Sequence, residues 1–197
     1  MSHRQRARRV SLPVRHTAKY DFEDQSDMKQ TIGSDDMTQP VHIGLVGMGT
    51  VGTGVVRVLQ DSADHIARQA GRPLIVEHVV VQDPKKPRSV ELSDKRLSSD
   101  LRKITDDPAI SVVAVLLGGL EPARTISLEL LRSGKDLVTA NKALLAEHGP
   151  ELFQAAREAG RSIAFEAAIG GGIPIVAAVS ECLTGNRISS IRGILNG

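Results

Sequence analysis

A strand that ends in a glycine-rich turn is the feature that most restricts how this chain can fold. Residues 41–52 read Val-His-Ile-Gly-Leu-Val-Gly-Met-Gly-Thr-Val-Gly, so an apolar run enters Gly47, Gly49 and Gly52 at G-x-G-x-x-G spacing. The first glycine of such a turn permits a tight bend, the second lets a pyrophosphate approach the backbone, and the third allows close helix–strand packing. The helix that follows directs its free N–H groups at the phosphates. We therefore predict a dinucleotide site here.

The glycine spacing alone is weak, because similar triplets occur in ordinary turns. The residues around it strengthen the prediction, since apolar side chains recur at near-helical spacing at Val51, Val55, Val58, Leu59, Ile66 and Ala67. Farther along the chain, Leu74–Val81 is an apolar run typical of a buried strand. Strand, glycine turn, helix and strand make a β-α-β unit, which is the context that gives the glycine pattern its meaning.

The alternation of strands and helices continues along the chain. We predict strands at 112–117, 137–140, 163–165 and 188–195. We also predict three helices, of which one starts at Pro122, one starts at Pro150 and one spans 174–183. The stretch between Arg88 and Pro108 gives no clear prediction. The expected fold class is α/β, a Rossmann-type doubly wound and mostly parallel sheet that is covered on both faces and binds ligands at the carboxyl ends of its strands.

Composition excludes several classes of function. The 25 basic and 23 acidic residues nearly balance at +2, and one Tyr, three Phe and no Trp offer little to stack on bases, so we expect no nucleic-acid partner. Cys182 is the single cysteine, which rules out a disulfide or cysteine-ligated zinc site within one chain, and we expect it to be a buried small hydrophobe. No apolar run reaches the ~20 residues that span a bilayer. We expect a cytoplasmic protein without a membrane partner.

Residues 1–40 differ in kind from the rest of the chain. Arg4, Arg6, Arg8 and Arg9 open the chain and an acidic stretch follows, with little apolar periodicity. This composition predicts a disordered tail. Met37 lies shortly before the first strand, so a second hypothesis is that translation starts there. Residues 41–187 are expected to form the nucleotide-binding domain.

Two charged side chains lie just after predicted strands, at the edge where ligands bind. Lys142 follows Thr-Ala-Asn; a lysine there is ordinarily just solvated, but a cation beside a nicotinamide could bind a substrate carboxylate or polarise a carbonyl. Glu166 is either an exposed cap or a ligand for a cation or substrate. The turn 170–172 is either merely flexible or holds a hard monovalent cation together with Glu166.

Five segments that occur in order resemble the homoserine dehydrogenase family. They are GMGTVG at 47–52, GGLEPAR at 118–124, TANKALLAEHG at 139–149, EAAIGGGIPI at 166–175 and GILNG at 193–197. The resemblance covers residues 41–197. It implies NAD- or NADP-dependent interconversion of L-aspartate 4-semialdehyde and L-homoserine, on the route to threonine, methionine and isoleucine.

The resemblance also implies roles for individual residues. Lys142 falls on the family's lysine at the nicotinamide and substrate, and is the expected catalytic residue. The expected cofactor-binding residues are Gly47, Gly49, Thr50, Val51, Gly52, Gln82, Asp83, Gly118, Gly119, Asn141 and Lys142. A sodium ion near the domain junction is expected at Glu166, Ile169, Gly171 and Ile173.

The signals for cofactor choice conflict. Asp83 ends the second predicted strand, where a carboxylate accepts from a ribose 2′-OH and repels a 2′-phosphate, which favours NAD. Lys85, Lys86 and Arg88 could instead bind that phosphate. The family often has an arginine where this chain has Gln82, and its loss inclines the expectation toward NAD or dual use.

Length is the main departure from the family pattern. In the family, Ile-Leu-Asn-Gly leads into a second domain that supplies the substrate pocket, further catalytic residues and the dimer sheet, whereas this chain stops at Gly197. We therefore expect 188–197 to begin that domain, homo-oligomers to form only in the full-length enzyme, and the chain to bind cofactor without useful turnover. The alternatives are a stand-alone NAD(P)-binding module without catalysis and a Rossmann reductase for another semialdehyde or an imine.

Overall fold

The computed structural model describes residues 39–90, 92–93 and 96–192 and folds them around one sheet. The strands are β1 (Val41–Val46), β2 (Leu74–Val80), β3 (Leu97–Ser98), β4 (Ile110–Val115), β5 (Asp136–Thr139) and β6 (Ile163–Ala164). They lie in the order β3-β2-β1-β4-β5-β6, and every neighbouring pair is parallel. This confirms the doubly wound Rossmann-type fold, with its switch point between β1 and β4. The predicted tail at 1–40 lies outside the described residues except for 39 and 40.

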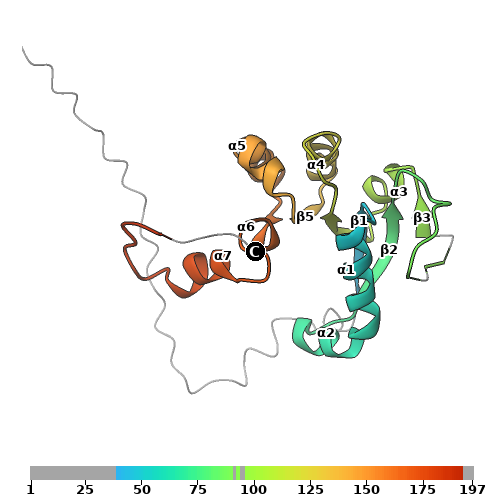
Figure 1. Cartoon of the computed structure of the whole chain (residues 1–197), viewed down its shortest axis with the longest axis horizontal. Helices are drawn as coiled ribbons and strands as arrows, with labels where there is room; N and C mark the ends of the chain where they lie inside the picture. Colours follow the sequence, from blue (N-terminus) through green and yellow to red (C-terminus); the bar gives the residue numbers. More distant parts are fainter. Residues whose placement is uncertain (1–38, 91, 94–95, 193–197) are drawn as a thin grey trace, which may run out of the picture. The chain divides into compact units, whose positions relative to one another are not determined.

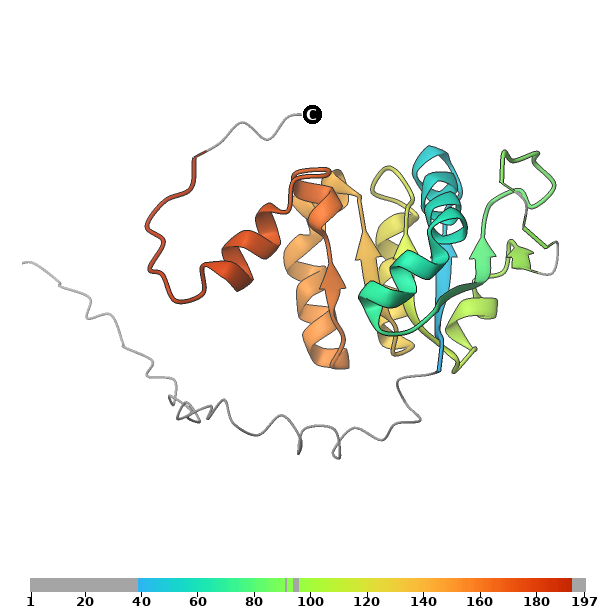
Figure 2. The ribbon, with the colours of Figure 1, turned by 90° about the horizontal axis from the view of Figure 1, so that it is seen from below.

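The helices pack on both faces of the sheet, with α1 and α2 on one face and α3, α4 and α5 on the other (Figures 1 and 2). Their bounds are α1 Thr50–Asp61, α2 Ala63–Ala70, α3 Arg102–Thr105, α4 Ala123–Arg132, α5 Lys142–Ala159, α6 Glu166–Ile169 and α7 Ile175–Ala177, which continues into a π-helical turn at Ala178–Cys182. Among the described residues, no helix has both the length and the apolar character needed to cross a membrane.

Side chains of β1 alternate between two cores. Leu45 belongs to a cluster with Val56 of α1, whereas Val46 belongs to a cluster with Ile104 of α3 and Leu130 of α4. Burial on both faces explains why the central strands read as continuous apolar runs. The cover is incomplete at β5, because Val138, which pairs in register with Ala114 on the α1 face, is 39% exposed.

Helix α5 begins at Lys142, so the prediction that it starts at Pro150 is wrong. Asn141 caps its N-terminus, because the side-chain oxygen accepts from the Leu144 N–H at 3.0 Å. Pro150 lies inside the helix, where a proline costs about 3 kcal/mol. Leu144 and Leu152 lie on either side of it and are almost completely buried. Their burial, at about 1.5–3 kcal/mol each, outweighs that cost.

Two predictions for the C-terminal part are also wrong. The described residues 188–192 form no strand, and Ile191 is 62% exposed; 193–195 lie outside the described residues. A strand needs a neighbour for its backbone groups, and apolar alternation alone does not provide one. Cys182 is exposed, and no other side chain of the helical segment 175–182 is buried either.

Candidate functional site

The glycine turn between β1 and α1 is built from three glycines in different surroundings. Gly47 has a positive φ of 92°, and a Cβ there would lie 2.9 Å from the Leu116 carbonyl oxygen. A Cβ at Gly52 would lie 2.2 Å from the carbonyl oxygen of Gly47. Gly49 is exposed, with open space where a side chain would be. The tight turn and close packing predicted for Gly47 and Gly52 are present, and Gly49 leaves an open approach.

Helix α1 presents its N-terminus at this open position. The Thr53 N–H donates to the Gly49 carbonyl at 2.9 Å, so the preceding N–H groups of the first turn lie before the first helical hydrogen bond. Gly49 is the N-cap and has no side chain that could occupy them. Thr50 and Val51 are exposed beside it, and the first turn, Thr-Val-Gly-Thr, carries no acidic side chain. The arrangement suits an anion such as a pyrophosphate.

A hollow of about 530 Å³ opens on one side of the glycine turn; we name it the Arg57 hollow. It is lined by Met48, Gly49, Thr50, Thr53, Gly54, Arg57, Lys86, Pro87, Arg88 and Ser89. Gln82 and Asp83 are exposed and do not line it. Sequence reasoning missed Arg57, although Thr50, Thr53 and Arg57 have the spacing of one helix face.

The loop after β2 is held by its own polar groups. Arg88 donates to the main-chain carbonyls of Asp83 and Lys86, both at 2.7 Å. A carboxylate oxygen of Asp83 accepts from the Lys85 N–H at 2.9 Å. Asp83 and Arg88 therefore shape the loop, while Lys86 and Arg57 provide positive charge along the hollow.

A second hollow, of about 310 Å³, lies on the other side of the turn; we name it the Lys142 hollow. It is mostly apolar and is lined by Val51, Leu116, Leu117, Gly118, Ala140, Asn141, Lys142 and Ala143. Lys142 is exposed and is the first residue of α5. The structure thus brings Val51, Gly118, Asn141 and Lys142 together, as a common site requires. Gly119 lies next to this wall with a φ of 76°.

The candidate sodium segment follows β6. Both carboxylate oxygens of Glu166 accept backbone N–H bonds, from Val176 at 2.8 Å and Ala177 at 3.0 Å, so this side chain caps α7. The Ile173 carbonyl accepts from the Ile175 N–H at 2.8 Å, and Gly171 has a φ of 62°. Among the described residues, no three His, Cys, Asp or Glu side chains gather as a metal-binding group. A cation here would have to be held mainly by main-chain carbonyls, including that of Ile169.

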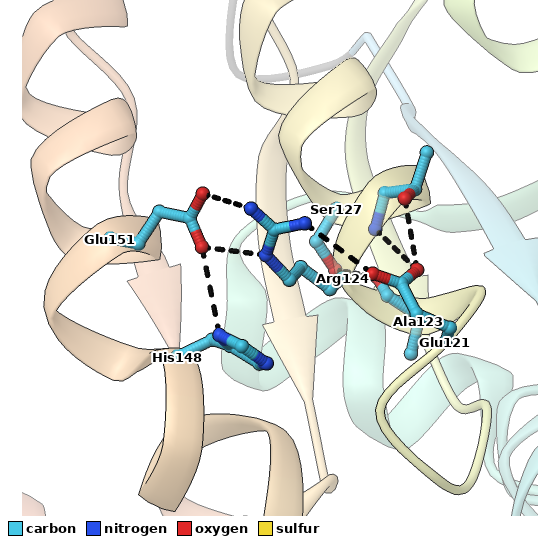
Figure 3. A network of polar contacts seen from close by, with 7 residues as sticks. Glu121, Ala123, Arg124, Ser127, His148 and Glu151 are labelled. Atoms are coloured by element: carbon cyan, nitrogen blue, oxygen red, sulfur yellow. Dashed lines mark hydrogen bonds and ion pairs between the residues drawn. The ribbon is translucent and has the colours of Figure 1, made fainter.

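An ion-pair network joins the helices that follow β4 and β5, as Figure 3 shows. Arg124 of α4 donates to both carboxylate oxygens of Glu151 on α5, from Nε at 2.7 Å and from Nη2, and its Nη1 lies 3.4 Å from Glu121. His148 Nδ1 lies 3.7 Å from the same Glu151 carboxylate. The hydrogen bond from Arg124 holds the pKa of Glu151 below its ordinary value. Sequence reasoning missed this link, which ties α4 to the helix that carries Lys142.

Known proteins with similar sequences and structures share this site-bearing region. A family model described as homoserine dehydrogenase, NAD binding domain, matches residues 47–166. Homoserine dehydrogenase of Synechocystis sp. is 48% identical over 161 residues, which are 80% of this chain and 36% of that protein. The crystal structure of a homoserine dehydrogenase from Thiobacillus denitrificans matches with a TM-score of 0.67 and 42% identity, over 76% of this chain and 35% of that one.

A more distant structure shares the fold. It is a hyperthermophilic archaeal homoserine dehydrogenase in complex with NADPH, with a TM-score of 0.56 and 20% identity over 72% of this chain and 48% of that one. The chain spans about a third of the length of curated relatives such as the Synechocystis protein. The family model, the relatives and the glycine turn agree, and the chain belongs to the homoserine dehydrogenase family, of which it carries the NAD-binding domain.

Proposed function

We propose that this chain binds NAD or NADP as the nucleotide-binding part of a homoserine dehydrogenase, which interconverts L-aspartate 4-semialdehyde and L-homoserine. The main support for this proposal is the Lys142 hollow, because Val51 of the glycine turn, Gly118 and Lys142 line it together. The hollow adjoins the switch point between β1 and β4, where doubly wound sheets bind their ligands. Membership of the family supplies the reaction.

Some residues of the site would bind the cofactor, and Lys142 would act on the substrate. When bound, the cofactor supplies hydride transfer to and from the substrate carbon. The amides at Gly49 and Thr50 would hold the pyrophosphate, and Val51 and Leu117 would offer apolar contact to the nicotinamide ring. The ammonium group of Lys142 holds the substrate and stabilises negative charge that develops on the carbonyl oxygen as it is reduced.

The Arg57 hollow supports the use of NADP alongside NAD. Arg57 and Lys86 line the hollow beside Gly49, whereas the Asp83 carboxylate binds an amide of its own loop. The positive charges suit a 2′-phosphate, and the Asp83 carboxylate, which would repel one, is not among the groups that line the hollow. This arrangement shifts the balance toward NADP compared with the sequence alone, and the archaeal NADPH complex is consistent with it.

The variant Arg57→Gln tests the cofactor choice. Losing a charge-assisted hydrogen bond to phosphate costs about 1.5–3 kcal/mol, so we expect the Kd for NADPH to rise about tenfold or more and the Kd for NADH to stay within about twofold. Arg68→Gln, at an exposed position of α2, is the matched control. Equal losses for both cofactors, or a wild type that binds NADH more than tenfold more tightly than NADPH, would refute the assignment.

We further propose that 41–187 form the nucleotide-binding domain and that 188–197 begin a second domain, which supplies the rest of the substrate pocket. The chain spans 36% of its Synechocystis relative, which leaves ample length for that domain. Full-length protein would then form homo-oligomers and act in threonine, methionine and isoleucine biosynthesis in the cytoplasm, with no nucleic-acid or membrane partner.

The segment that follows β6 is a candidate site for a sodium ion. Main-chain carbonyls at Ile169, Gly171 and Ile173, with Glu166, would form an oxygen-lined site that braces the domain junction, because hard cations prefer oxygen ligands. Glu166 contributes by holding α7 in place with both carboxylate oxygens. Thermal unfolding in sodium and choline salts at equal ionic strength tests this, and identical midpoints would exclude a sodium site in this chain.

Binding and turnover of the 197-residue chain test the main proposal together. We expect NADH or NADPH fluorescence to shift on binding, while no homoserine-dependent reduction of NAD or NADP occurs. Each missing general acid or base typically removes about 10²–10⁴-fold in rate. Absence of cofactor binding would refute the proposed function. Robust turnover that disappears in Lys142→Ala would confirm the lysine and refute the need for a second domain.

A further inference from the structure

Asn141 ties together two segments that the sheet brings to the same edge. Its Nδ2 donates to the carbonyl oxygens of Leu117, at 3.0 Å, and Gly119, at 2.6 Å. Its Oδ1 accepts from the Leu144 N–H at 3.0 Å, and its own N–H donates to the Thr139 hydroxyl at 3.1 Å. The residue is 8% exposed. One buried side chain thus bonds to the loop after β4 and to the first turn of α5.

These partners occupy the hydrogen-bonding groups that an asparagine amide offers. It has two N–H donors and one carbonyl oxygen, and here both donors face carbonyls while the oxygen faces an N–H. The reverse orientation would place the amide oxygen against two carbonyls, so the contacts themselves fix which way the amide points. A side chain bonded in this way is not free to make its main contacts with a ligand.

The two carbonyls stand on either side of Gly118, which lines the Lys142 hollow. Gly118 and Gly119 are exposed glycines, and Gly119 has a φ of 76°. Such a loop has many alternative conformations, so an attachment on each side of Gly118 restricts where this wall can lie. The cap on Leu144 similarly fixes the start of α5, whose first residue is Lys142.

We propose that Asn141 is a positioning residue, which holds Gly118 and Lys142 at a fixed separation across the nicotinamide end of the cofactor site and acts on the cofactor through them. This inference rests on the proposed function, because it concerns how the chain receives the nicotinamide half of the cofactor. Asn141 would keep in place the loop at Gly118, against which the nicotinamide half of the cofactor would bind. The four hydrogen bonds of Asn141 described above go to Thr139, Leu117, Gly119 and Leu144, and none of the four goes to the glycine turn, which would receive the pyrophosphate.

The variant Asn141→Asp separates the two halves of the site. Aspartate has nearly the same shape and is an equally good N-cap, so α5 keeps its start. It has no N–H donors, and its carboxylate would face the carbonyls of Leu117 and Gly119, which releases the loop. Asn141→Ser is a neutral second variant, which keeps a capping oxygen but cannot reach both carbonyls. Asn186→Asp, at an exposed position, is the matched control for the change of charge.

The readout is the affinity for a whole cofactor and for a fragment that lacks nicotinamide. Whichever of NADH and NADPH the wild type binds more tightly is titrated against ADP-ribose or 2′-phospho-ADP-ribose, respectively. For both Asn141 variants we expect the Kd of the whole cofactor to rise about tenfold, equivalent to 1.4 kcal/mol, with the Kd of the fragment within about twofold of wild type. Asn186→Asp should change neither value.

The outcomes distinguish a positioning role from a merely structural one. A general loosening of the fold would weaken cofactor and fragment equally, and that result would overturn the proposal. Unchanged affinities in both variants would overturn it as well. If the wild type binds neither cofactor nor fragment, the proposed function fails and this inference fails with it. If the wild type binds both and the ratio of the two Kd values is insensitive to Asn141, only the inference fails.

Discussion

Replacing Gly52 by alanine tests the geometry of the glycine turn. A Cβ at this position would lie 2.2 Å from the Gly47 carbonyl oxygen, so helix and turn must separate by about 1 Å to reach an ordinary contact. Overpacking costs about 1–3 kcal/mol, and a backbone carbonyl cannot swing aside, so we expect the upper end. Alanine returns about 0.5–1 kcal/mol of helix preference over glycine, which leaves a net loss of about 2 kcal/mol.

This loss has two measurable consequences. For a chain of this size, about 2 kcal/mol lowers the thermal midpoint by about 4–8 °C. The same separation displaces the amides at Gly49 and Thr50 from the pyrophosphate, so the Kd for NADH or NADPH should rise at least about tenfold. Differential scanning fluorimetry and fluorescence titration measure the two effects on one preparation.

Gly54→Ala is the matched control, because it lies in the same helix and a Cβ there meets nothing within 4 Å. It should raise the midpoint by about 1–4 °C, through helix preference alone. Because Gly54 lines the Arg57 hollow, it is a control for stability and not for affinity. If Gly52→Ala instead raises the midpoint as Gly54→Ala does, and leaves the Kd at its wild-type value, the close approach of helix and turn is not a constraint on this fold.

Three further substitutions separate binding from stability. Gly49→Ala should keep the midpoint, since a Cβ there meets nothing within 4 Å, but should weaken cofactor binding about tenfold by intruding on the pyrophosphate; a lower midpoint with unchanged Kd would contradict this. Lys135→Met should leave the Kd unchanged and cost about 1–3 kcal/mol, because the buried ammonium donates to two main-chain carbonyls; calorimetry showing no loss would contradict it. Because Arg124 lowers the pKa of Glu151, their link stabilises the fold above the ordinary carboxyl pKa of 4.5 and is lost as pH falls through the lower folded value. Glu151→Gln should therefore lower the midpoint at neutral pH, and its difference from wild type should close in acid; a difference independent of pH would exclude the link.

The elements that could be predicted from the sequence are those whose signal is burial. Leu45 and Val46 point into opposite cores, and this two-sided burial gives the central strands their continuous apolar runs. The glycine turn was predictable for a related reason, since Gly47 and Gly52 sit where a side chain would meet backbone. In both cases the structure restricts which residue type can stand at the position, so the local sequence reports the restriction.

The features that could not be predicted depend on partners distant in sequence. Arg124 and Glu151 are 27 positions apart, and no local pattern pairs them. Asn141 was expected to contact cofactor, but its bonds to Leu117 and Gly119 depend on β4 and β5 being neighbours. Its role as an N-cap was the one local signal available, and it would have placed the start of α5 correctly.

The wrong prediction of a strand at 188–195 also depends on a missing neighbour. Apolar alternation at 188–195 favoured a strand, yet the described residues there have no partner strand and Ile191 is largely exposed. The same applies to Cys182, whose apolar neighbours in sequence form no core in 175–182. Hydrophobic pattern predicts burial only where another surface is available to cover it.

Hydrogen–deuterium exchange with and without NADPH tests most directly the claim that a nicotinamide cofactor binds across the glycine turn. We expect slower amide exchange at 47–53, 116–119 and 140–144, which form the turn and the walls of the Lys142 hollow. The hollow lined by His78, Asp100 and Arg102 serves as an internal reference and should show no change. Protection confined to that hollow, or no protection at 47–53 at saturating NADPH, would contradict the claim.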